Sequence, residues 1–443
     1  MTADAIHANA PAKQPSLRRL IIAATIGNVF EWFDFVVYGF FAVTLAEVFF
    51  PAANPTVSLL VTFGAFGLAY LVRPLGAIVI GGYTDRAGRK SGLLLSMALM
   101  MIGTTLMAVT PGYATIGIAA PIIITVARLL QGFSVGGEFG SAVSFLVEHG
   151  GKRRGFSASW QWATTGVITV LASLFGVLLT SLLTHDQLLR WGWRIPYIFG
   201  MLVGPAGLYV RAQIVETREF VEAEKPETIP IKDLLRRHPV PVLLSLGISI
   251  ISNSSFYILA YIPTYGVKTL HLPASTGFIA TLIGGVILAV GSPLAGHWSD
   301  KLPRRPLLMV ITCSLFVLTS YPAFYLMAAW PSLTACIMAV GWLQLLKAGY
   351  SGVLPSLLSE QFPVDTRAIG VSLSFSTAVS VFGGLAPFVA TWLIAATGDK
   401  LSPSYYLVFT ALLSLFALMA IQWRGRRVAE TLARPSALAP LQE

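Results

Sequence analysis

The chain has 443 residues, of which 55% are hydrophobic and only 11% are charged. Soluble proteins carry about 25% charged residues, so this composition excludes a soluble globular fold and indicates a protein that lies in a bilayer. The net charge of +10 does not indicate nucleic-acid binding, because Lys and Arg gather in alternate connections between apolar stretches.

The apolar stretches follow one another along the whole chain, and each is long enough for the roughly 20 residues that a membrane-spanning helix needs. We expect an all-α membrane protein with twelve transmembrane helices. Their expected bounds are 20–46, 57–82, 91–110, 116–147, 156–183, 195–212, 240–266, 274–298, 306–327, 332–359, 368–396 and 404–423.

The basic residues orient these helices. When the N-terminus is placed in the cytoplasm, most Lys and Arg residues lie on the cytoplasmic side, as the positive-inside rule requires. The first apolar stretch is too long and too interrupted for a cleaved signal sequence. We therefore expect a multi-pass protein of the inner (cytoplasmic) membrane with both termini in the cytoplasm.

The longest polar connection, from about Ala212 to His238, divides six helices from six. The segment Gly81–Lys90, GGYTDRAGRK, recurs as Gly296–Arg305, GHWSDKLPRR, which indicates two related halves. Two bundles packed around a site at the bilayer midplane suit alternating access. The expected parts are a cytoplasmic tail (1–19), a six-helix bundle (20–212), a central loop (213–239), a second six-helix bundle (240–423) and a cytoplasmic tail (424–443).

The repeated segment has the composition of a tight turn between two helices, in which glycines allow close approach and the basic cluster stays in the cytoplasm. A structural role and a gating role both remain open for its charges, and Pro303 replaces the second glycine of the later copy. The residues concerned are Gly81, Asp85, Arg86, Gly88, Arg89, Asp300 and Arg304.

Residues 81–90 resemble the signature of the major facilitator superfamily. The segments Gly27–Phe35, Arg73–Gly76 and Trp191–Pro196 resemble the metabolite:proton symporter family within it. Arg128–Gly132 and Thr397–Lys400 are similar to its citrate and tricarballylate transporters. The resemblance implies proton symport of an organic acid.

Six ionisable residues fall inside the expected helices, where each costs about 2.5 to 3.5 kcal/mol at a helix centre. Such residues need a functional or structural partner. The three acids and three bases carry no net charge together, so pairing among them would neutralise the cavity when no substrate is bound. The six are Glu31, Asp34, Arg73, Arg128, Glu138 and Lys347.

Glu31 and Asp34 stand three residues apart on one helical face, with Tyr38 one turn beyond. The pair either shares a proton and couples transport to it, or forms a structural pair with an arginine or a helix-end cap. In the fourth helix, Arg128 and Gln131 share one stripe with Glu138. Arg128 either clamps a substrate carboxylate or pairs with the acids of the first helix.

Arg73 lies about 12 Å into its helix from the cytoplasmic end and either meets substrate or snorkels. Lys347 falls near the midplane of a helix in the second half and suits an anionic substrate. Asn253 and Tyr257 belong to a hydrogen-bonding face of the seventh helix. We assign proton coupling to Asp34, Glu31 and Glu138, and substrate binding to Arg73, Arg128, Lys347, Gln131, Tyr38, Asn253 and Tyr257.

No Gly-rich loop precedes a Lys-Ser or Lys-Thr pair, and the histidines lack metal-ligand spacing. Cys313 and Cys336 both fall inside expected helices and indicate no disulfide framework. These patterns give no support to ATP coupling or to an enzyme, and we expect neither a metal site nor a cofactor. The family resemblance favours H+ as the coupling ion, although the chemistry of Asp34 also suits sodium.

The sequence therefore predicts a monomeric secondary transporter, with no nucleic-acid partner, that imports an organic acid such as citrate or tricarballylate with protons. Three alternatives stay open: a dicarboxylate, a zwitterionic solute such as proline or betaine, and a non-transporting sensor built on the same fold.

Overall fold

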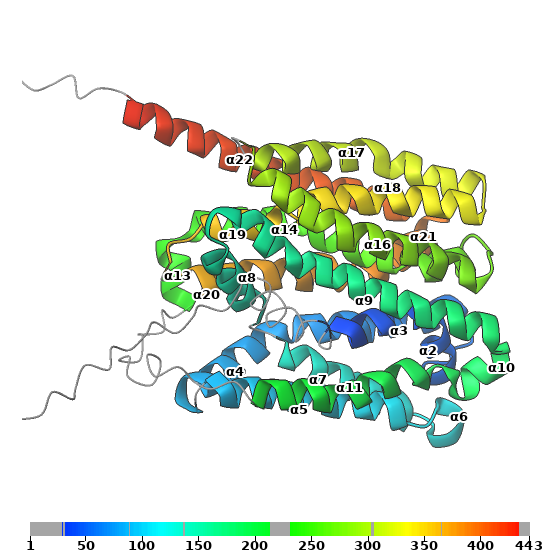
Figure 1. Ribbon diagram of the computed structural model, residues 1–443. Helices are drawn as coiled ribbons and strands as arrows, with labels where there is room; N and C mark the ends of the chain where they lie inside the picture. Colours follow the sequence, from blue (N-terminus) through cyan, green and yellow to red (C-terminus); the bar gives the residue numbers. More distant parts are fainter. Residues whose placement is uncertain are drawn as a thin grey trace, which may run out of the picture.

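The computed structural model describes residues 29, 32–87, 89–135, 138–212, 231–302, 305–364 and 366–433. It describes backbone alone for 81–82, 84–87, 89–90, 93, 138, 141, 149, 203, 206–212, 231–232 and 425–433. Every regular element within the described residues is helical, and the long helices run side by side in one bundle (Figure 1).

The first half of the chain opens with helical residues 32–40, which meet α2 (Ala42–Phe49) at a bend of 76°. The elements that follow are α3 (Pro55–Leu71), α4 (Arg73–Ala87), α5 (Arg89–Val109), α6 (Tyr113–Ile116), α7 (Ala119–Ser134), α8 (Glu138–His149), η1 (Gly151–Arg153), α9 (Arg154–Leu182), α10 (His185–Gln187), η2 (Leu188–Gly192) and α11 (Arg194–Ala212).

The second half contains several helices that are broken by short irregular or π-helical stretches. Its elements are α13 (Ile231–Arg237), α14 (Pro239–Ala260), α15 (Ile262–Lys268), α16 (Ala274–Ser299), α17 (Pro306–Ala329), α18 (Leu333–Ser351), α19 (Leu354–Glu360), α20 (Arg367–Ala378), η3 (Val379–Gly383), α21 (Ala386–Thr397) and α22 (Ser402–Ala433).

Within the described residues, 8 helices are long and apolar enough to cross a membrane, and the bent pair 32–40 with α2 raises this number to 9. Two shorter apolar helices, Leu94–Val109 and Ala119–Ser134, lie among them. Large apolar side chains face outward along the bundle, for example Leu182 (75% exposed) and Leu318 (67% exposed). Such a surface is stable in lipid and not in water, so the bundle is a membrane protein.

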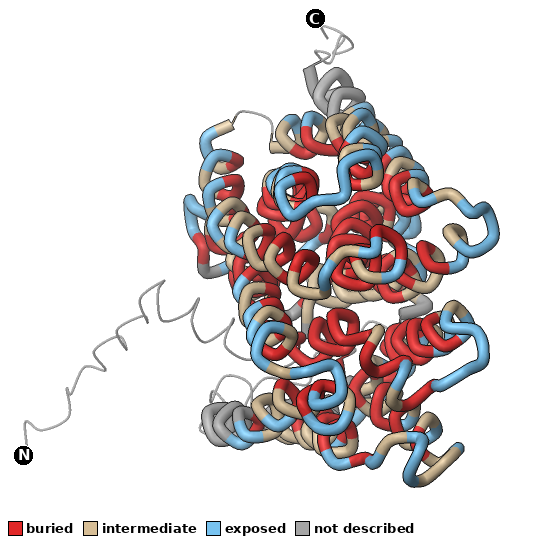
Figure 2. The backbone as a smooth tube through the Cα atoms, turned by 90° about the vertical axis from the view of Figure 1, so that its right-hand side faces the viewer, coloured by how far each residue is buried: buried red, intermediate tan, exposed pale blue. Residues whose placement is uncertain are grey.

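Buried residues concentrate between the helices, whereas exposed ones lie on the outer faces and the connections (Figure 2). The interior is also unusually polar, because more than forty buried polar or charged side chains are present, many of them Ser and Thr. Most buried hydroxyls bond to the carbonyl three or four residues earlier, as Thr62 does to Ser58 (2.8 Å). These hydroxyls therefore remain satisfied without water, whereas several other buried polar atoms have no partner among the described residues.

One expected helix is wrong in its extent. The continuous helix 116–147 is instead two helices, because α7 ends at Ser134 and Val135 leaves the helical conformation before α8 starts. The side chain of Glu138 lies outside the described part of the chain, so the predicted stripe is described only for Arg128 and Gln131. Proline explains a similar break between α14 and α15, where Pro263 opens the second helix.

Glycines let the helices of the site approach closely. A Cβ on Gly132 of α7 would clash with the backbone of Ala69 on α3, and a Cβ on Gly76 of α4 would clash with the backbone of Phe133. These contacts fix α3, α4 and α7 against one another and so set the positions of Arg73 and Arg128.

The two halves of the chain touch along α9 and α16, whose backbones meet at Gly166 and Gly285. They also touch at both ends of the bundle (Figure 1). At the end that carries α10, Lys268 reaches Glu47 (3.5 Å). At the end that carries α19, Arg367 reaches Glu148 (3.2 Å). Ion pairs therefore join the two halves at both ends of the bundle.

Candidate functional site

The helical residues 32–40 place Asp34 in the interior of the bundle with 2% exposure. Its Oδ2 accepts hydrogen bonds from the Thr104 hydroxyl of α5 and from Nε2 of Gln131 on α7 (3.1 Å). Arg128 donates from Nη1 to Oε1 of the same Gln131 (2.8 Å). Gln131 thus bridges the acid and the base, and Asp34 and Arg128 are linked without a direct ion pair.

Space beside Asp34 depends on α11. A Cβ on Gly200 would lie 2.7 Å from Oδ1 of Asp34, so only glycine leaves room for this oxygen. Oδ1 has no hydrogen-bond partner among the described residues. The carboxylate therefore keeps one free oxygen where a proton or a ligand group can bind.

Arg128 is fully buried, and its guanidinium lies against aromatic rings. Its Cζ is 4.4 Å from the ring centre of Phe35 and 4.5 Å from that of Tyr38. Nε and Nη2 have no hydrogen-bond partner among the described side chains. A buried cation with two idle donors is costly, and a carboxylate ligand would satisfy both donors.

Arg73 opens α4 and is 2% exposed. Its Cζ lies 4.5 Å from the ring centre of Tyr70, 4.8 Å from that of Trp32 and 5.1 Å from that of Phe35. Nε and Nη2 again lack a partner within the described part of the chain. Because Phe35 touches both Arg73 and Arg128, the two guanidiniums face a shared region. The expectation that Arg73 snorkels is not supported by its burial.

Lys347 of α18 is fully buried in the second half of the chain. Its ammonium donates to the carbonyl oxygen of Ser252 (2.6 Å) and lies 3.5 Å from Oγ of Ser351. The ammonium also lies 4.0 Å from the ring centre of Trp162 on α9. Among the described side chains, no carboxylate lies within 4.0 Å of it.

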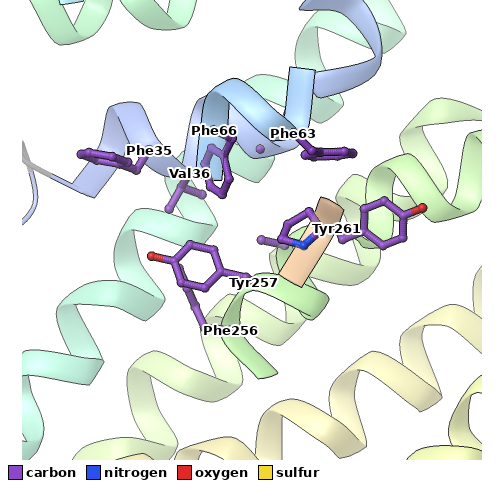
Figure 3. A pocket seen from close by; sticks show the side chains of 10 residues that line it. Phe35, Val36, Phe63, Phe66, Phe256, Tyr257 and Tyr261 are labelled. Carbon is purple, nitrogen blue, oxygen red and sulfur yellow. The ribbon is translucent and has the colours of Figure 1, made fainter. Parts of the chain in front are cut away.

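A small apolar cavity lies beside aromatic rings that contact the cations (Figure 3). Phe35 contributes to its wall and also touches both arginines. Phe66 and Tyr257, both labelled in Figure 3, also line it and pack edge-on at a centroid distance of 5.8 Å. The lining residues come from both halves of the chain: Phe35, Val36, Gly39, Phe63, Phe66, Phe256, Tyr257, Ala260, Tyr261 and Pro387.

The other predicted substrate residues surround the cations less directly. The Tyr38 hydroxyl donates to the Thr62 carbonyl (3.1 Å), and its ring covers Arg128. Tyr257 packs edge-on against Tyr70 at a centroid distance of 5.1 Å. Asn253 donates to the Ser249 carbonyl of its own helix (2.8 Å), which makes its present role structural.

Several predicted residues lie outside the described part of the chain: Glu31, Gly88 and Arg304, together with the side chains of Glu138, Asp85, Arg86 and Arg89 and the surroundings of Gly81. Asp300 is described. Its carboxylate accepts from the backbone N–H groups of Gly155 (2.8 Å) and Phe156 (3.0 Å), and so it binds the N-terminus of α9. This contact joins the two halves at the α19 end.

Sequence reasoning missed Thr104, Gly200 and most of the rings that contact the cations, although it included Tyr38. Trp32, Phe35 and Tyr38 repeat every three residues on helix 1, and this aromatic face was a signal that could have identified the partners of the arginines. Trp162 and Phe256 carried no such signal, because only the packing of α9 against the second half brings the two rings together, 6.3 Å apart.

Metal and thiol chemistry have no support in the described residues, which contain no group of three or more His, Cys, Asp or Glu side chains placed to hold a metal ion. Cys313 and Cys336 are buried and free. Among the described side chains, the candidate site comprises Asp34, the three buried cations and the aromatic rings beside them.

Family models identify the class of the chain. The model described as Major Facilitator Superfamily matches residues 24–290, and that described as Sugar (and other) transporter matches residues 209–434. The chain is 39% identical to the citrate-proton symporter of Salmonella typhi over 90% of this chain and 92% of the relative. It is 34% identical to the proline/betaine transporter of Salmonella typhimurium over 93% of this chain and 84% of the relative.

Solved structures agree on the fold. The chain resembles the crystal structure of a D-xylose-proton symporter with a TM-score of 0.69 and 18% sequence identity, covering 90% of this chain and 97% of the other. At this identity the likeness concerns the arrangement of the helices alone.

Proposed function

The chain belongs to the major facilitator superfamily, and from that premise we propose that it imports a polycarboxylate of the citrate or tricarballylate type by proton symport through alternating access. The protein is a transporter of the inner membrane, with several membrane-spanning helices, and not an enzyme. The printed function of the citrate-proton symporters that it resembles supports the substrate class.

The proposal includes the finer architecture. Twelve spans form two six-helix bundles, 20–212 and 240–423, joined by a cytoplasmic loop at 213–239, with tails 1–19 and 424–443 in the cytoplasm. The candidate spans with the bent pair and the two shorter apolar helices account for eleven of these spans, and α11 (Arg194–Ala212) is the proposed twelfth. The contact of α9 with α16 supports two halves that rock against each other. We propose that one chain suffices for transport.

One observation carries the substrate class: the described interior holds three buried cations and a single buried acid. Several buried N–H donors lack hydrogen-bond partners among the described residues. They include Nε and Nη2 of Arg73, Nε and Nη2 of Arg128, and Nε1 of Trp162. An acceptor-rich anion with more than one carboxylate satisfies these donors together. The carboxylates of this anion bind to Arg73, Arg128 and Lys347. The side chains that line the cavity around the bound anion are Gln131, Tyr38, Tyr257 and Asn253.

Asp34 couples this anion to a proton, with Glu31 and Glu138 as further carboxyls. Asp34 has one free oxygen and shares Gln131 with Arg128, so protonation of the acid and occupation of Arg128 influence each other through one amide. When Asp34 is protonated, the hold of the acid on Gln131 weakens and Arg128 is freed for substrate. The proposed coupling ion is H+, and transport needs no cofactor.

Alternating access requires that contacts at each end break in turn. The loop motif residues Gly81, Asp85, Arg86, Gly88 and Arg89, together with Asp300 and Arg304, form the gate at the cytoplasmic end in this proposal. The bond of Asp300 to the α9 N-terminus supports it, because this contact is lost when the halves separate at the α19 end.

Uptake into proteoliposomes tests the proposal. With an outside-acid pH gradient, we expect radiolabelled citrate or tricarballylate to accumulate and an uncoupler to abolish accumulation. A sodium gradient at equal pH is the control for the coupling ion. Uptake that ignores the pH gradient, or a preference for betaine over every carboxylate tested, would contradict the proposal.

A zwitterionic substrate is the second candidate, because proline/betaine transporters are also similar to the chain over most of its length and because aromatic rings suit an onium group. The same uptake assay decides between the two. A dicarboxylate and a non-transporting sensor remain further alternatives, which competition and uptake itself separate from a polycarboxylate transporter.

A further inference from the structure

Lys347 is held in a way that differs from a usual buried lysine. Its ammonium sits between the ring of Trp162 (4.0 Å) and the ring of Phe256 (5.5 Å), with the Ser252 carbonyl as its close oxygen partner. An ammonium is strongly hydrated, and a lysine within a bundle ordinarily pairs with an acid. Here two aromatic faces and one carbonyl take that place among the described residues.

Two aromatic faces around a desolvated cation form the kind of cage that recognises quaternary ammonium ligands. The box is defined by Trp162, Phe256 and the Ser252 carbonyl. It is built from both halves of the chain, because Trp162 comes from α9 and the other two groups come from α14. The lysine that fills it comes from a third helix, α18.

The box adjoins the guanidinium of Arg73. Phe256 contacts the ring of Trp32 edge-on at 6.5 Å, and Trp32 in turn covers Arg73 at 4.8 Å. The ring of Trp32 therefore stands between the box and Arg73, and this separation exceeds the single carbon between the onium nitrogen and the carboxylate of glycine betaine. Without Lys347 the box by itself suits the onium group of a zwitterion.

We propose that Lys347 sets the charge of the accepted substrate by filling this box with its own ammonium. The tethered cation excludes the onium group of a zwitterion by occupation and by charge repulsion, and it presents a third positive centre to a polycarboxylate. This inference rests on the proposed function, since it explains why that site prefers polycarboxylates to zwitterions.

The test compares Lys347→Met with Lys347→Arg in purified, reconstituted protein. Methionine is neutral, one atom shorter and unable to donate to the Ser252 carbonyl, so it removes the charge and no longer fixes the end of the side chain in the box, while the rings stay in place. We expect Lys347→Met to weaken citrate uptake at least tenfold and to let glycine betaine compete or be transported at concentrations at least tenfold lower than in the wild type. Lys347→Arg keeps a cation in the box and should retain the carboxylate preference.

The gained affinity for glycine betaine should depend on the box itself. The double variant Lys347→Met/Trp162→Leu removes one aromatic face and should lose that gain, whereas Lys347→Met/Trp330→Leu alters an exposed tryptophan and should keep it. Direct binding to detergent-purified protein provides a second readout that does not require turnover. Replacing a buried charge by an apolar side chain is compatible with folding in a bilayer, and Lys347→Gln serves as a second neutral variant.

Two failures are distinguishable. If wild-type protein accumulates citrate but neither neutral variant gains glycine betaine affinity, the box proposal is overturned and the proposed function stands. If wild-type protein transports glycine betaine and rejects carboxylates, the proposed function fails, and with it the premise that Lys347 excludes zwitterions.

Discussion

The two fully buried cations on α7 and α18 are held in opposite ways. Arg128 belongs to a hydrogen-bonded set in which Gln131 connects it to Asp34. Lys347 has aromatic rings and serine oxygens around it but no acid among the described side chains. The first site holds an acid and a base that share one amide, whereas the second holds a base with no acid beside it among the described side chains. This difference is the basis on which we propose coupling in the first half and charge selection in the second.

Removal of Arg128 should have the largest effect. Arg128→Ala leaves Asp34 without its nearby cation and deletes two donors for substrate, and breaking a buried charged set costs about 3 to 5 kcal/mol. We expect uptake and exchange of citrate both to fall at least about a hundredfold, since 1.4 kcal/mol corresponds to a factor of ten. Arg128→Lys, which keeps the charge but loses the planar fork, should retain partial exchange. If Arg128→Ala exchanged citrate at the wild-type rate, Arg128 would not be needed for transport, and the proposed difference between the Arg128 and Lys347 sites would be wrong.

Asp34→Asn should separate the two functions of the first site. Asparagine keeps the shape and the contact with Thr104 but cannot release a proton. We expect citrate exchange between loaded vesicles to persist within a few-fold of wild type, while accumulation driven by a pH gradient disappears. Lys347→Met should instead weaken the exchange and the accumulation of citrate together. Unchanged accumulation by Asp34→Asn would assign coupling to another carboxyl.

Thr104→Val tests the hydroxyl that sequence reasoning missed. Valine is nearly isosteric and removes the hydrogen bond that Thr104 donates to Asp34. A hydrogen bond to a charged group contributes about 1.5 to 3 kcal/mol, so gradient-driven uptake should fall roughly tenfold or more. Thr104→Ser keeps the hydroxyl and is the matched control. Equal uptake by the valine and serine variants would show that this bond does not support the coupling site.

The sequence predicted the helical membrane fold well, because apolar stretches of about 20 residues leave little choice of structure in a bilayer. It failed at the break after Ser134, where no proline marks the end of α7. It identified the cations of the site, because buried charge is conspicuous within an apolar stretch. It could not identify Trp162 or Gly200 as their neighbours, since these arise from contacts between helices far apart in sequence.

The smallest effect is expected at the rim, where a charge pair joins the halves in contact with water. Glu148 is 45% exposed and lies 3.2 Å from Arg367, and exposed pairs contribute about 0.2 to 1 kcal/mol. Glu148→Gln should therefore change uptake by less than about fivefold. Asp300→Asn, which weakens a more buried contact with the α9 N-terminus, should reduce uptake more than Glu148→Gln does. If Glu148→Gln abolished transport as Arg128→Ala is expected to do, an exposed charge at the rim would matter as much as a buried one. Burial would then not explain why Arg128 and Lys347 are important for transport.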